Sequence, residues 1–392
     1  MSLYDNARLL IDGELVAAQG GRTFENINPA TEEVLGLVPD ASVEDTERAI
    51  AAARRAFDES PWATDHALRS RCLRQLRDGL QERIEELRKI TVSEVGCPIS
   101  MTYGPGLDDC VKWLGDYANF LDGYEWKTDM GVAEVMGSKT QRWILREPAG
   151  VMAAITPWNV PNDINLKKLG WAMAAGCTVV LKAAPTTSWC ANFLGEIIAT
   201  KTDVPAGAVN ILTSGDNAAI GEMLTADPRV DMVGFTGSTG VGKRIGEVCG
   251  SQVKRVQLEL GGKSPAIVLP DMPGLTHVAG AMGATVCFHA GQGCAIFTRL
   301  LVPKSELDAC ADAVIQSLKN VKYGDPFDPE NIMGPQNSAI QRERVEGHIQ
   351  HAIDQGGKLL VGGGRATQFE KGYFMQPTAF IADENSDLAQ NE

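Results

Sequence analysis

The stretch VDMVGFTGSTGVGKRIGEVC fills residues 230–249 and contains one complete unit of the predicted fold. Its apolar start, residues 230–235, is typical of a buried strand, and residues 240–249 are typical of a helix. The glycines between them form a turn. A strand that leads through such a turn into a helix N-terminus can bind an anion with backbone N–H groups. The stretch therefore predicts a phosphate-binding unit.

The same rhythm of strands and helices extends toward both ends of the chain. Apolar runs predict further strands over residues 151–156, 178–181, 209–212 and 253–258. Helical patterns between them cover residues 163–175, 189–198 and 218–225. Strands that alternate with helices in this way predict an α/β fold with βαβ units around a parallel sheet.

Other patterns precede this region. Residues 8–40 form short extended pieces separated by turn signals, and Ser42 is a good N-cap for a first helix. Apolar residues at helical spacing predict a long second helix over residues 67–90. Alternation over residues 124–147 predicts an exposed hairpin, of a kind that often serves an assembly.

A second α/β region begins after Gly261-Gly262, with helices expected over residues 305–318 and 339–354. The glycine pair and the change in motif density place a domain boundary there. We expect a first domain of residues 1–123 and 148–260, a hairpin of residues 124–147 and a second domain of residues 261–392.

Composition excludes several classes of protein. The chain has 392 residues, 44% apolar and 22% charged, which predicts a globular protein of two or three domains. Its net charge of −14, without a long basic tract, argues against a nucleic-acid partner. Nine cysteines, never spaced Cys-x-x-Cys, indicate a reducing compartment without a zinc site. Because residues 1–10 lack a signal region and no run could span a membrane, we expect a cytoplasmic protein.

Two common nucleotide-binding patterns fail at the glycine turn. Residues 237–243 match the Gly-x4-Gly-Lys of a P-loop, but Arg244 stands where Mg²⁺ requires a hydroxyl. The dinucleotide pattern Gly-x-Gly-x-x-Gly begins at Gly240 and Gly242 and then meets Ile245. The turn thus predicts a phosphate cradle without specifying the cofactor, and a P-loop NTPase is the alternative.

Two polar side chains at predicted strand ends are candidates for chemistry. Asn159 lies between two prolines in Thr156-Pro-Trp-Asn-Val-Pro161, and its amide can donate to an oxyanion. On these residues alone, capping of the following turn is favoured for Asn159. Glu259 follows an apolar run, where desolvation would raise its pKa toward that of a useful base; an ordinary surface glutamate is the alternative.

Cys294 differs from the other eight cysteines because small residues surround it in Gly291-Gln-Gly-Cys294. A helix that began just after it would stabilise a thiolate. His289 could act as the base of a Cys/His hydrolase, although the glycines between them fix no orientation and no Asn or Asp partner is evident. His348 and His351 could share a helical face, but nothing completes a metal site, so we expect no metal.

Taken in order, these runs resemble the aldehyde dehydrogenase superfamily over nearly the whole chain. The matching segments are Ile11-Asp-Gly-Glu14, Asn28-Pro-Ala-Thr31, Pro157-Trp-Asn159, Lys182, Phe235-Thr-Gly-Ser238, Leu258-Glu-Leu-Gly-Gly-Lys-Ser-Pro265, Gly291-Gln-Gly-Cys294 and Gly334-Pro335. The resemblance implies a dinucleotide-binding first domain, an oligomerisation hairpin and a catalytic second domain. It also implies a homodimer or homotetramer.

The resemblance implies a role for each matched residue. Cys294 would attack the aldehyde as a thiolate, the Asn159 amide and the Cys294 N–H would hold the oxyanion, and Glu259 would activate water to hydrolyse the thioester. Lys182 and Ser238 would hold the adenosine ribose and the pyrophosphate. The full set of expected cofactor-binding residues is Thr156, Pro157, Trp158, Lys182, Ala184, Pro185, Gly215, Phe235, Gly237, Ser238, Thr239, Gly240, Gly242, Leu260 and Glu392.

Three features depart from the family pattern. Many members have an acid three residues beyond the lysine, but this chain has Lys182-Ala-Ala-Pro185, so NADP is expected to be tolerated beside NAD. Residues 213–216 are looser than the family's usual glycine turn. The sequence stops at Glu392, the expected nicotinamide-ribose ligand, where the family would continue with Phe-Gly-Pro. Roughly a hundred family residues would follow, judged against domain size.

Two functions from different classes follow. The first is oxidation of a small-molecule aldehyde to its acid with NAD or NADP; CoA-acylating oxidation is disfavoured because Glu259 supplies a base for hydrolysis. The second is a non-catalytic dinucleotide-binding or assembly protein, made inactive by the shorter C-terminus.

Overall fold

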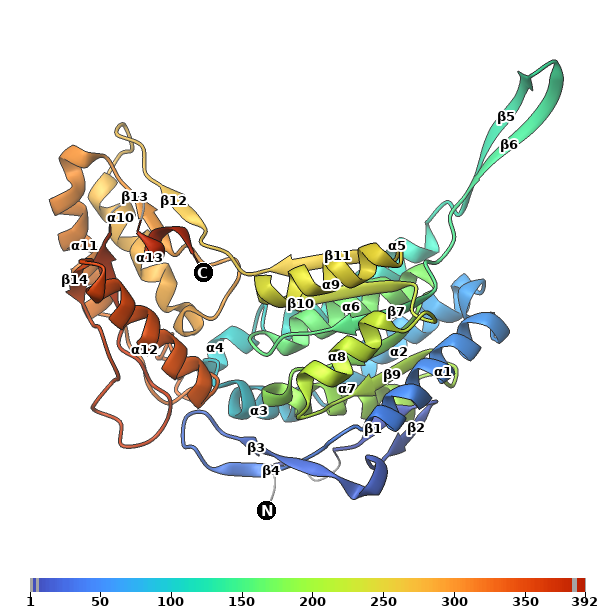
Figure 1. The fold of residues 1–392 in the computed structure, drawn as a ribbon, viewed down its shortest axis with the longest axis horizontal. Helices are drawn as coiled ribbons and strands as arrows, with labels where there is room; N and C mark the ends of the chain where they lie inside the picture. The colour runs from blue at the N-terminus through green and yellow to red at the C-terminus, as the bar shows by residue number, and fades with distance from the viewer. Residues whose placement is uncertain (1–2, 5–6, 383–385, 392) are drawn as a thin grey trace.

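A seven-stranded sheet forms the centre of the larger part of the molecule (Figure 1). The computed structural model describes residues 3–4, 7–382 and 386–391. The strands lie in the order β11-β10-β7-β8-β9-β1-β2; the first five are parallel, and β1 pairs antiparallel with both β9 and β2. Their bounds are β1 (Leu9–Ile11), β2 (Glu14–Val16), β7 (Val151–Ile155), β8 (Thr178–Lys182), β9 (Val209–Leu212), β10 (Met232–Gly237) and β11 (Arg255–Leu260).

Helices cover both faces of this sheet, as the buried apolar strands require. Side chains alternate along β7, so Met152 and Ala154 enter one core while Val151, Ala153 and Ile155 enter the other. The first core contains α2 (His66–Glu82), α5 (Asp108–Asp122), α6 (Pro161–Ala175) and α7 (Ser188–Lys201). The second contains α1 (Val43–Glu59), α8 (Asn217–Ala226) and α9 (Thr239–Ser251). The predicted α/β fold is confirmed.

Two helices near the N-terminus illustrate what local sequence determines. The Ser42 side chain accepts from the Asp45 N–H at 3.1 Å and the Asp45 carboxylate accepts from the Ser42 N–H at 3.0 Å, which caps α1 as expected. The single helix expected over residues 67–90 is wrong. It is interrupted at Arg83, which has φ −117° and ψ 24° and ends α2 before α3 (Ile84–Val95) begins.

Two hairpins lie outside the central sheet. One consists of β3 (Thr23–Ile27) and β4 (Val34–Pro39), and the other of β5 (Lys127–Val135) and β6 (Ser138–Leu145). The second projects away from the body of the molecule (Figure 1). At its base the Trp126 ring stacks on His66 with centroids 4.2 Å apart, and the Arg69 guanidinium lies over the same ring.

The described residues after β11, 261–382 and 386–391, form a smaller α/β body beside the central sheet (Figure 1). It contains two separate two-stranded sheets, parallel β12–β13 and antiparallel β14–β15. The bounds of its elements are β12 (Pro265–Ile267), α10 (Leu275–Ala284), β13 (Arg299–Leu301), α11 (Leu307–Lys319), α12 (Ala339–Asp354), β14 (Lys358–Val361), β15 (Ala379–Ile381) and α13 (Asp387–Gln390). Among the described helices, none is long and apolar enough to cross a membrane.

Candidate active site

The order of the strands places a binding site at the carboxyl edge of the central sheet. From β7 the chain continues to β8 and β9 on one side, and then to β10 and β11 on the other. The connections that follow β7 and β10 therefore diverge at that edge, which is where ligands bind in open α/β sheets. Residues 156–160 and Ser238 follow these two strands.

Asn159 lies beyond the end of β7 and contacts the second body of the molecule. Its side-chain Nδ2 donates to the Gln292 carbonyl oxygen at 2.9 Å. An amide nitrogen carries two hydrogens, so this bond leaves one of them available to a ligand. Asn159 is thereby held against Gln292, which precedes Cys294 by two positions. The turn-capping role that its local sequence favours does not account for this contact.

The thiol of Cys294 is accessible. Of the nine cysteines, all of which are free, Cys294 alone is exposed and the other eight are buried. The expected helix directly after it is wrong, because residues 294–296 form a turn and the next regular element is β13. Helix N–H groups therefore do not stabilise a thiolate here.

His289 supports Asn159. Its ring nitrogen Nε2 lies 2.8 Å from the Asn159 carbonyl oxygen, which can only accept, so Nε2 carries the hydrogen. The ring is buried, and burial lowers its pKa to about 4. Because His289 is neutral and its Nε2 hydrogen is bound by Asn159, the arrangement does not favour the Cys/His hydrolase alternative.

Gln292, to which the sequence analysis assigned no role, fixes the turn that carries the thiol. Its Nε2 donates to the carbonyl oxygens of His289 at 3.1 Å and Pro335 at 3.2 Å, while its Oε1 accepts from the Asn337 N–H at 2.8 Å. Asn337 in turn donates to the Glu94 carbonyl oxygen on α3 at 3.1 Å. Buried hydrogen bonds thus tie the thiol-bearing turn to the larger body. A glutamine between two glycines gives no sequence signal for this role.

Glu259 is the penultimate residue of β11 and lies opposite Thr236 of β10. Its position at a strand end is confirmed, but its expected burial is wrong because the side chain is exposed. β11 is the edge strand of the sheet, which explains why apolar sequence neighbours do not enclose the carboxylate.

Lys168 on α6 is the buried charged partner that sequence analysis missed. It is 7% exposed, and burial lowers the pKa of its amine to about 8 against the opposing influence of the Glu259 carboxylate. Its Nζ lies over Gly234 of β10, 3.5 Å from where a Cβ would stand. The pair Lys167-Lys168 in a largely apolar helix, eight and nine residues after Asn159, is the signal that could have identified it.

The expected ribose-binding lysine lies at the end of β8. Lys182 is buried, and its Nζ donates to the Asn217 side-chain oxygen and, at 3.2 Å, to the Ala183 carbonyl oxygen. Burial lowers its pKa to about 8, partly offset by the Asp216 carboxylate. Asp216 therefore brings an acid to a site whose own segment, residues 182–185, has none.

The other expected cofactor residues lie at the same sheet edge. Thr156 donates its backbone N–H to the Lys182 carbonyl oxygen at 3.0 Å, and Pro157 and Trp158 are half-buried. Ala184 and Pro185 follow β8, and Gly215 follows β9, where its N–H donates to Asp40 at 3.0 Å. The carboxyl ends of β7, β8 and β9 thus bring these separate runs together.

Only Ser238 separates β10, which ends with Phe235-Thr-Gly237, from α9. That connection is too short for a P-loop, and Arg244 pairs with Glu222 instead of approaching a phosphate. Thr239, Gly240 and Gly242 form the first turn of α9. A Cβ at Gly242 would stand 2.5 Å from the Leu260 side chain, so the glycine permits the close packing of α9 on β11.

Polar atoms at this edge fit a nucleotide. The Thr186 and Thr236 hydroxyl oxygens are buried and have no hydrogen-bond partner within the described part of the chain. Thr186 lies just after β8 and Thr236 lies in β10, so both belong to strands whose ends form the site. Unpaired hydroxyls, a buried lysine and a helix N-terminus are suited to ribose hydroxyls and phosphates. The expected ligand Glu392 lies outside the described residues.

Comparison with known proteins agrees with this geometry. A model of the aldehyde dehydrogenase family matches residues 15–392. The 3-succinoylsemialdehyde-pyridine dehydrogenase of Pseudomonas sp. is 37% identical over 383 residues, covering 96% of this chain and 77% of the relative. The crystal structure of Mycobacterium tuberculosis aldehyde dehydrogenase complexed with NAD⁺ is similar with a TM-score of 0.91 at 36% identity, covering 98% of this chain and 78% of that one.

A mutant of aldehyde dehydrogenase C from Pseudomonas syringae, crystallised with NAD⁺ and octanal, has a TM-score of 0.91 at 31% identity. That match covers 99% of this chain and 78% of the other. The resemblance inferred from the ordered motifs is therefore confirmed by sequence and by structure. The chain belongs to the aldehyde dehydrogenase family.

Proposed function

We propose that this chain oxidises an aldehyde to a carboxylic acid with NAD or NADP, using Cys294 as the nucleophile. The observation that carries the proposal is the 2.9 Å hydrogen bond from the Asn159 amide to the Gln292 carbonyl oxygen. It holds an oxyanion donor beside the turn that bears the single exposed thiol. Family membership supports the reaction class, and it does not favour the non-catalytic alternative.

In the first half of the reaction, the Cys294 sulfur forms a bond to the aldehyde carbon and gives a thiohemiacetal. The free hydrogen of the Asn159 amide and the Cys294 backbone N–H stabilise the negative oxygen. A bound dinucleotide would supply the acceptor for the hydride that leaves this carbon. A thioester on Cys294 results. The Asn159 amide then donates one hydrogen to the Gln292 carbonyl oxygen and the other to the substrate oxygen.

In the second half, Glu259 takes a proton from water, and the resulting hydroxide attacks the thioester carbon. The carboxylic acid leaves and the sulfur recovers its electron pair. An exposed Glu259 has access to that water. Lys168, with a pKa of about 8, is suited to receive the proton from Glu259 because its amine is partly neutral near that pH.

The dinucleotide would lie across the carboxyl ends of β7, β8, β9 and β10, with Lys182 at the adenosine ribose and Ser238 at the pyrophosphate. The two solved structures named above, from Mycobacterium tuberculosis and Pseudomonas syringae, are complexes with NAD⁺. Here the segment Lys182-Ala-Ala-Pro185 has no acid to repel a 2′-phosphate, which supports NADP as well. Asp216 is the acid that limits this tolerance, because its carboxylate is close enough to influence Lys182.

We further propose that residues 1–123 and 148–260 form the dinucleotide-binding domain and residues 261–392 the catalytic domain. The hairpin of residues 124–147 would join copies of the chain in a homodimer or homotetramer. Val132 and Trp143 on this hairpin are 63% and 50% exposed, which supports an assembly surface. The nine free cysteines support a cytoplasmic location.

The test is the initial rate of reduced-nicotinamide formation with a panel of aliphatic and aromatic aldehydes, using NAD or NADP. We expect turnover that Cys294→Ala abolishes. Cys310→Ala is the matched control, because Cys310 is a buried thiol on α11, outside the proposed site, and its removal should leave the rate unchanged. Equal rates for the Cys294→Ala variant and the unmodified chain would refute the proposed nucleophile.

A further inference from the structure

The last turn of α3, residues 91–95, lies at a junction of several parts of the proposed site. The Thr91 hydroxyl oxygen accepts from the side-chain amide of Asn162 at 2.8 Å. Asn162 belongs to the first turn of α6, three residues after the oxyanion donor Asn159. Both Thr91 and Asn162 are buried. This turn of α3 thus anchors the start of the helix that follows Asn159.

The carboxylate of Glu94, in the same turn of α3, holds the first turn of α7. Its two oxygens accept from the Trp189 N–H at 3.0 Å and from the Cys190 N–H at 2.7 Å. A third donor is the Asn26 side-chain amide on β3, at 2.8 Å. A carboxylate is favoured at a helix N-terminus because the first N–H groups have no partner within the helix. Glu94 therefore joins α7 and β3 to α3.

Glu94 is completely buried, and these three donors are neutral groups. Burial raises its pKa to about 6, in keeping with the cost of removing a charge from water. A serine or an asparagine would cap α7 without that cost. A carboxylate differs from those caps because its two oxygens accept from several donors at once, so it can hold separate segments together.

The first turn of α7 directly follows the segment that we propose to bind the dinucleotide. Residues 183–187 connect Lys182, at the end of β8, to α7. The hydroxyl oxygens of Thr186 and Thr187 are buried and have no hydrogen-bond partner within the described part of the chain. A ligand that bonds to these hydroxyls would order the residues immediately before the two N–H groups that donate to Glu94.

The main chain of the same turn of α3 supports the thiol-bearing turn, residues 289–294. The Glu94 and Val95 carbonyl oxygens accept from the Asn337 side-chain amide at 3.1 and 3.3 Å. The Asn337 N–H donates to Gln292 Oε1 at 2.8 Å. Glu94 therefore contacts the start of α7 through its side chain and, through its carbonyl oxygen, the residue that holds Gln292.

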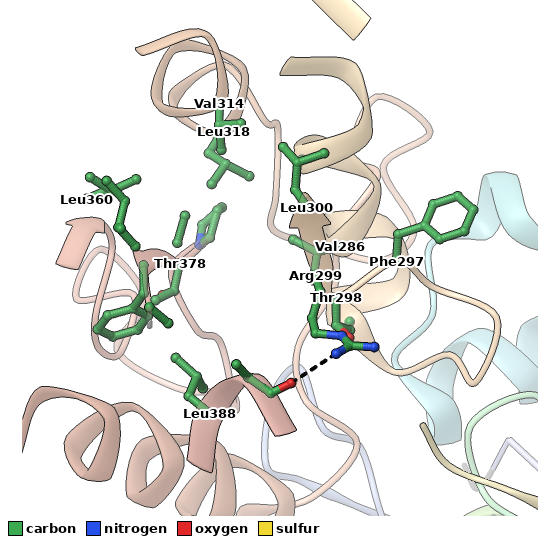
Figure 2. A pocket seen from close by; sticks show the side chains of 18 of the residues that line it. Val286, Phe297, Thr298, Arg299, Leu300, Val314, Leu318, Leu360, Thr378 and Leu388 are labelled. Carbon is green, nitrogen blue, oxygen red and sulfur yellow. Dashed lines mark hydrogen bonds between the residues drawn. The ribbon is translucent and has the colours of Figure 1, made fainter. Parts of the chain in front are cut away.

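The thiol-bearing turn also borders an apolar groove of the smaller body. This groove lies between β13 and β15, has a volume of about 840 Å³, and is lined by Ala290 together with Val286 and Leu300, which Figure 2 shows. Gln336 lines it as well, and its Nε2 donates to the Ala290 carbonyl oxygen at 3.0 Å. Gln336 and Asn337 thus hold the thiol-bearing turn at two consecutive positions.

We propose that Glu94 is a positioning residue that couples the dinucleotide segment after β8 to the thiol-bearing turn. This rests on the proposed function, because it concerns the same dinucleotide and the same thiol. When a ligand orders residues 183–187, the first turn of α7 is held more firmly against Glu94, and the last turn of α3 is stabilised as a result. Asn337 and Gln292 carry that stabilisation to the turn that bears Cys294. Opening of this turn should therefore become rarer when the adenosine half of the dinucleotide is bound.

The probe is ADP-ribose, which has the adenosine and phosphate groups of the dinucleotide but no nicotinamide to cover the thiol. Amide hydrogen exchange of the full chain is measured with and without saturating ADP-ribose. In the unmodified chain we expect exchange to slow about fivefold at Trp189 and Cys190, and to slow by about the same factor at residues 289–294.

Glu94→Gln should uncouple the two segments. Glutamine has nearly the shape of glutamate, but its NH₂ group cannot accept from a backbone N–H of α7. ADP-ribose should still slow exchange at residues 183–187 of this variant and should leave exchange at residues 289–294 unchanged. Asn337→Ala interrupts the same path at its other end and should have the same effect, so a folding failure of Glu94→Gln leaves the test intact.

Asp45→Asn is the matched control. Asp45 is also a completely buried carboxylate that accepts from two backbone N–H groups near a helix N-terminus, but these belong to Ser42 and Gln19, outside α3 and α7. This variant should keep the slowing at residues 289–294. Circular dichroism establishes that each variant is folded.

If Glu94 had only a structural role, its replacement would alter exchange in the free chain and leave the slowing by ADP-ribose in place; that result would overturn the proposal. Slowing at Trp189 and Cys190 of the unmodified chain without slowing at residues 289–294 would equally overturn it. If ADP-ribose slowed exchange nowhere in the unmodified chain, the dinucleotide site itself would be refuted, and the coupling with it. None of these readouts requires turnover, so the coupling can fail while aldehyde oxidation stands.

Discussion

Replacing His289 by glutamine should remove a large part of the acid sensitivity of this protein. His289 is buried and neutral, with its Nε2 hydrogen bonded to Asn159 and its Nδ1 without a partner among the described residues. Burial lowers the pKa of the ring from 6.5 to about 4. In the unfolded chain the ring would titrate at its ordinary pKa.

The sign of the effect follows from these two values. Between pH 6.5 and about pH 4 the unfolded state binds a proton at this ring and the folded state does not. The stability that the neutral ring contributes is therefore complete above pH 6.5 and is lost as the pH falls to about 4. A difference of this size corresponds to about 3 kcal/mol in the free energy of unfolding.

The assay is urea unfolding of the unmodified chain and His289→Gln, followed by circular dichroism at several pH values across that window. Other titrating groups, such as Glu94, whose pKa burial raises to about 6, are present in both chains and cancel in the comparison. Any strain from placing glutamine at φ 51° is independent of pH and also cancels. We expect the unmodified chain to lose about 3 kcal/mol more than the variant.

His277→Gln is the matched control, since His277 is exposed on α10. That substitution should leave the pH dependence close to that of the unmodified chain. Parallel curves for the unmodified chain and His289→Gln would refute the reasoning, because they would mean that the ring titrates alike in the folded and unfolded states.

Three further predictions concern catalysis. Asn159→Ala should lower kcat by about 10²–10³, the usual effect of losing an oxyanion donor; an unchanged kcat in steady-state assays would contradict the assignment. Lys168→Met should abolish the rise in the thioester hydrolysis rate near pH 8, measured as acid release in single-turnover experiments, whereas Lys167→Met, whose lysine pairs with Asp163, should retain it. Asp216→Asn should improve the affinity for NADP relative to NAD by about tenfold, or about 1.4 kcal/mol, because it removes the remaining acid near Lys182; equal dissociation constants before and after the change would show that Asp216 is too distant.

The central sheet and its helices could be predicted from sequence because their signals are local. Runs such as residues 209–212 are apolar and bounded by turn residues, and the structure has β9 over those same residues. The break at Arg83 could not be predicted in this way. The apolar spacing continues through it, and the guanidinium contacts Glu86 and the distant Glu196.

The candidate site was predictable in its residues but less so in their surroundings. Asn159, Glu259 and Cys294 lie in the ordered motifs, yet the exposure of Glu259 depends on β11 being the edge strand. Sheet order is a property of the whole fold. The roles of Lys168 and Gln292 could not be predicted either, because their contacts come from segments far apart in the chain.

The groove between β13 and β15 could not be inferred from local patterns either. The strands of this region are three or four residues long, and their pairing into two separate sheets is a tertiary feature. Apolar side chains at positions such as Leu300 indicate burial but do not show which neighbour covers them.

The most direct test of the account is the mass of the protein after mixing Glu259→Gln with an aldehyde and the oxidised dinucleotide. This variant retains the thiol and the Asn159 amide but lacks the base for hydrolysis, so an acyl group should accumulate on the peptide that contains Cys294 while about one equivalent of reduced nicotinamide forms. An acyl group on another cysteine, or rapid turnover with no acylated protein, would contradict the proposed roles of Cys294 and Glu259.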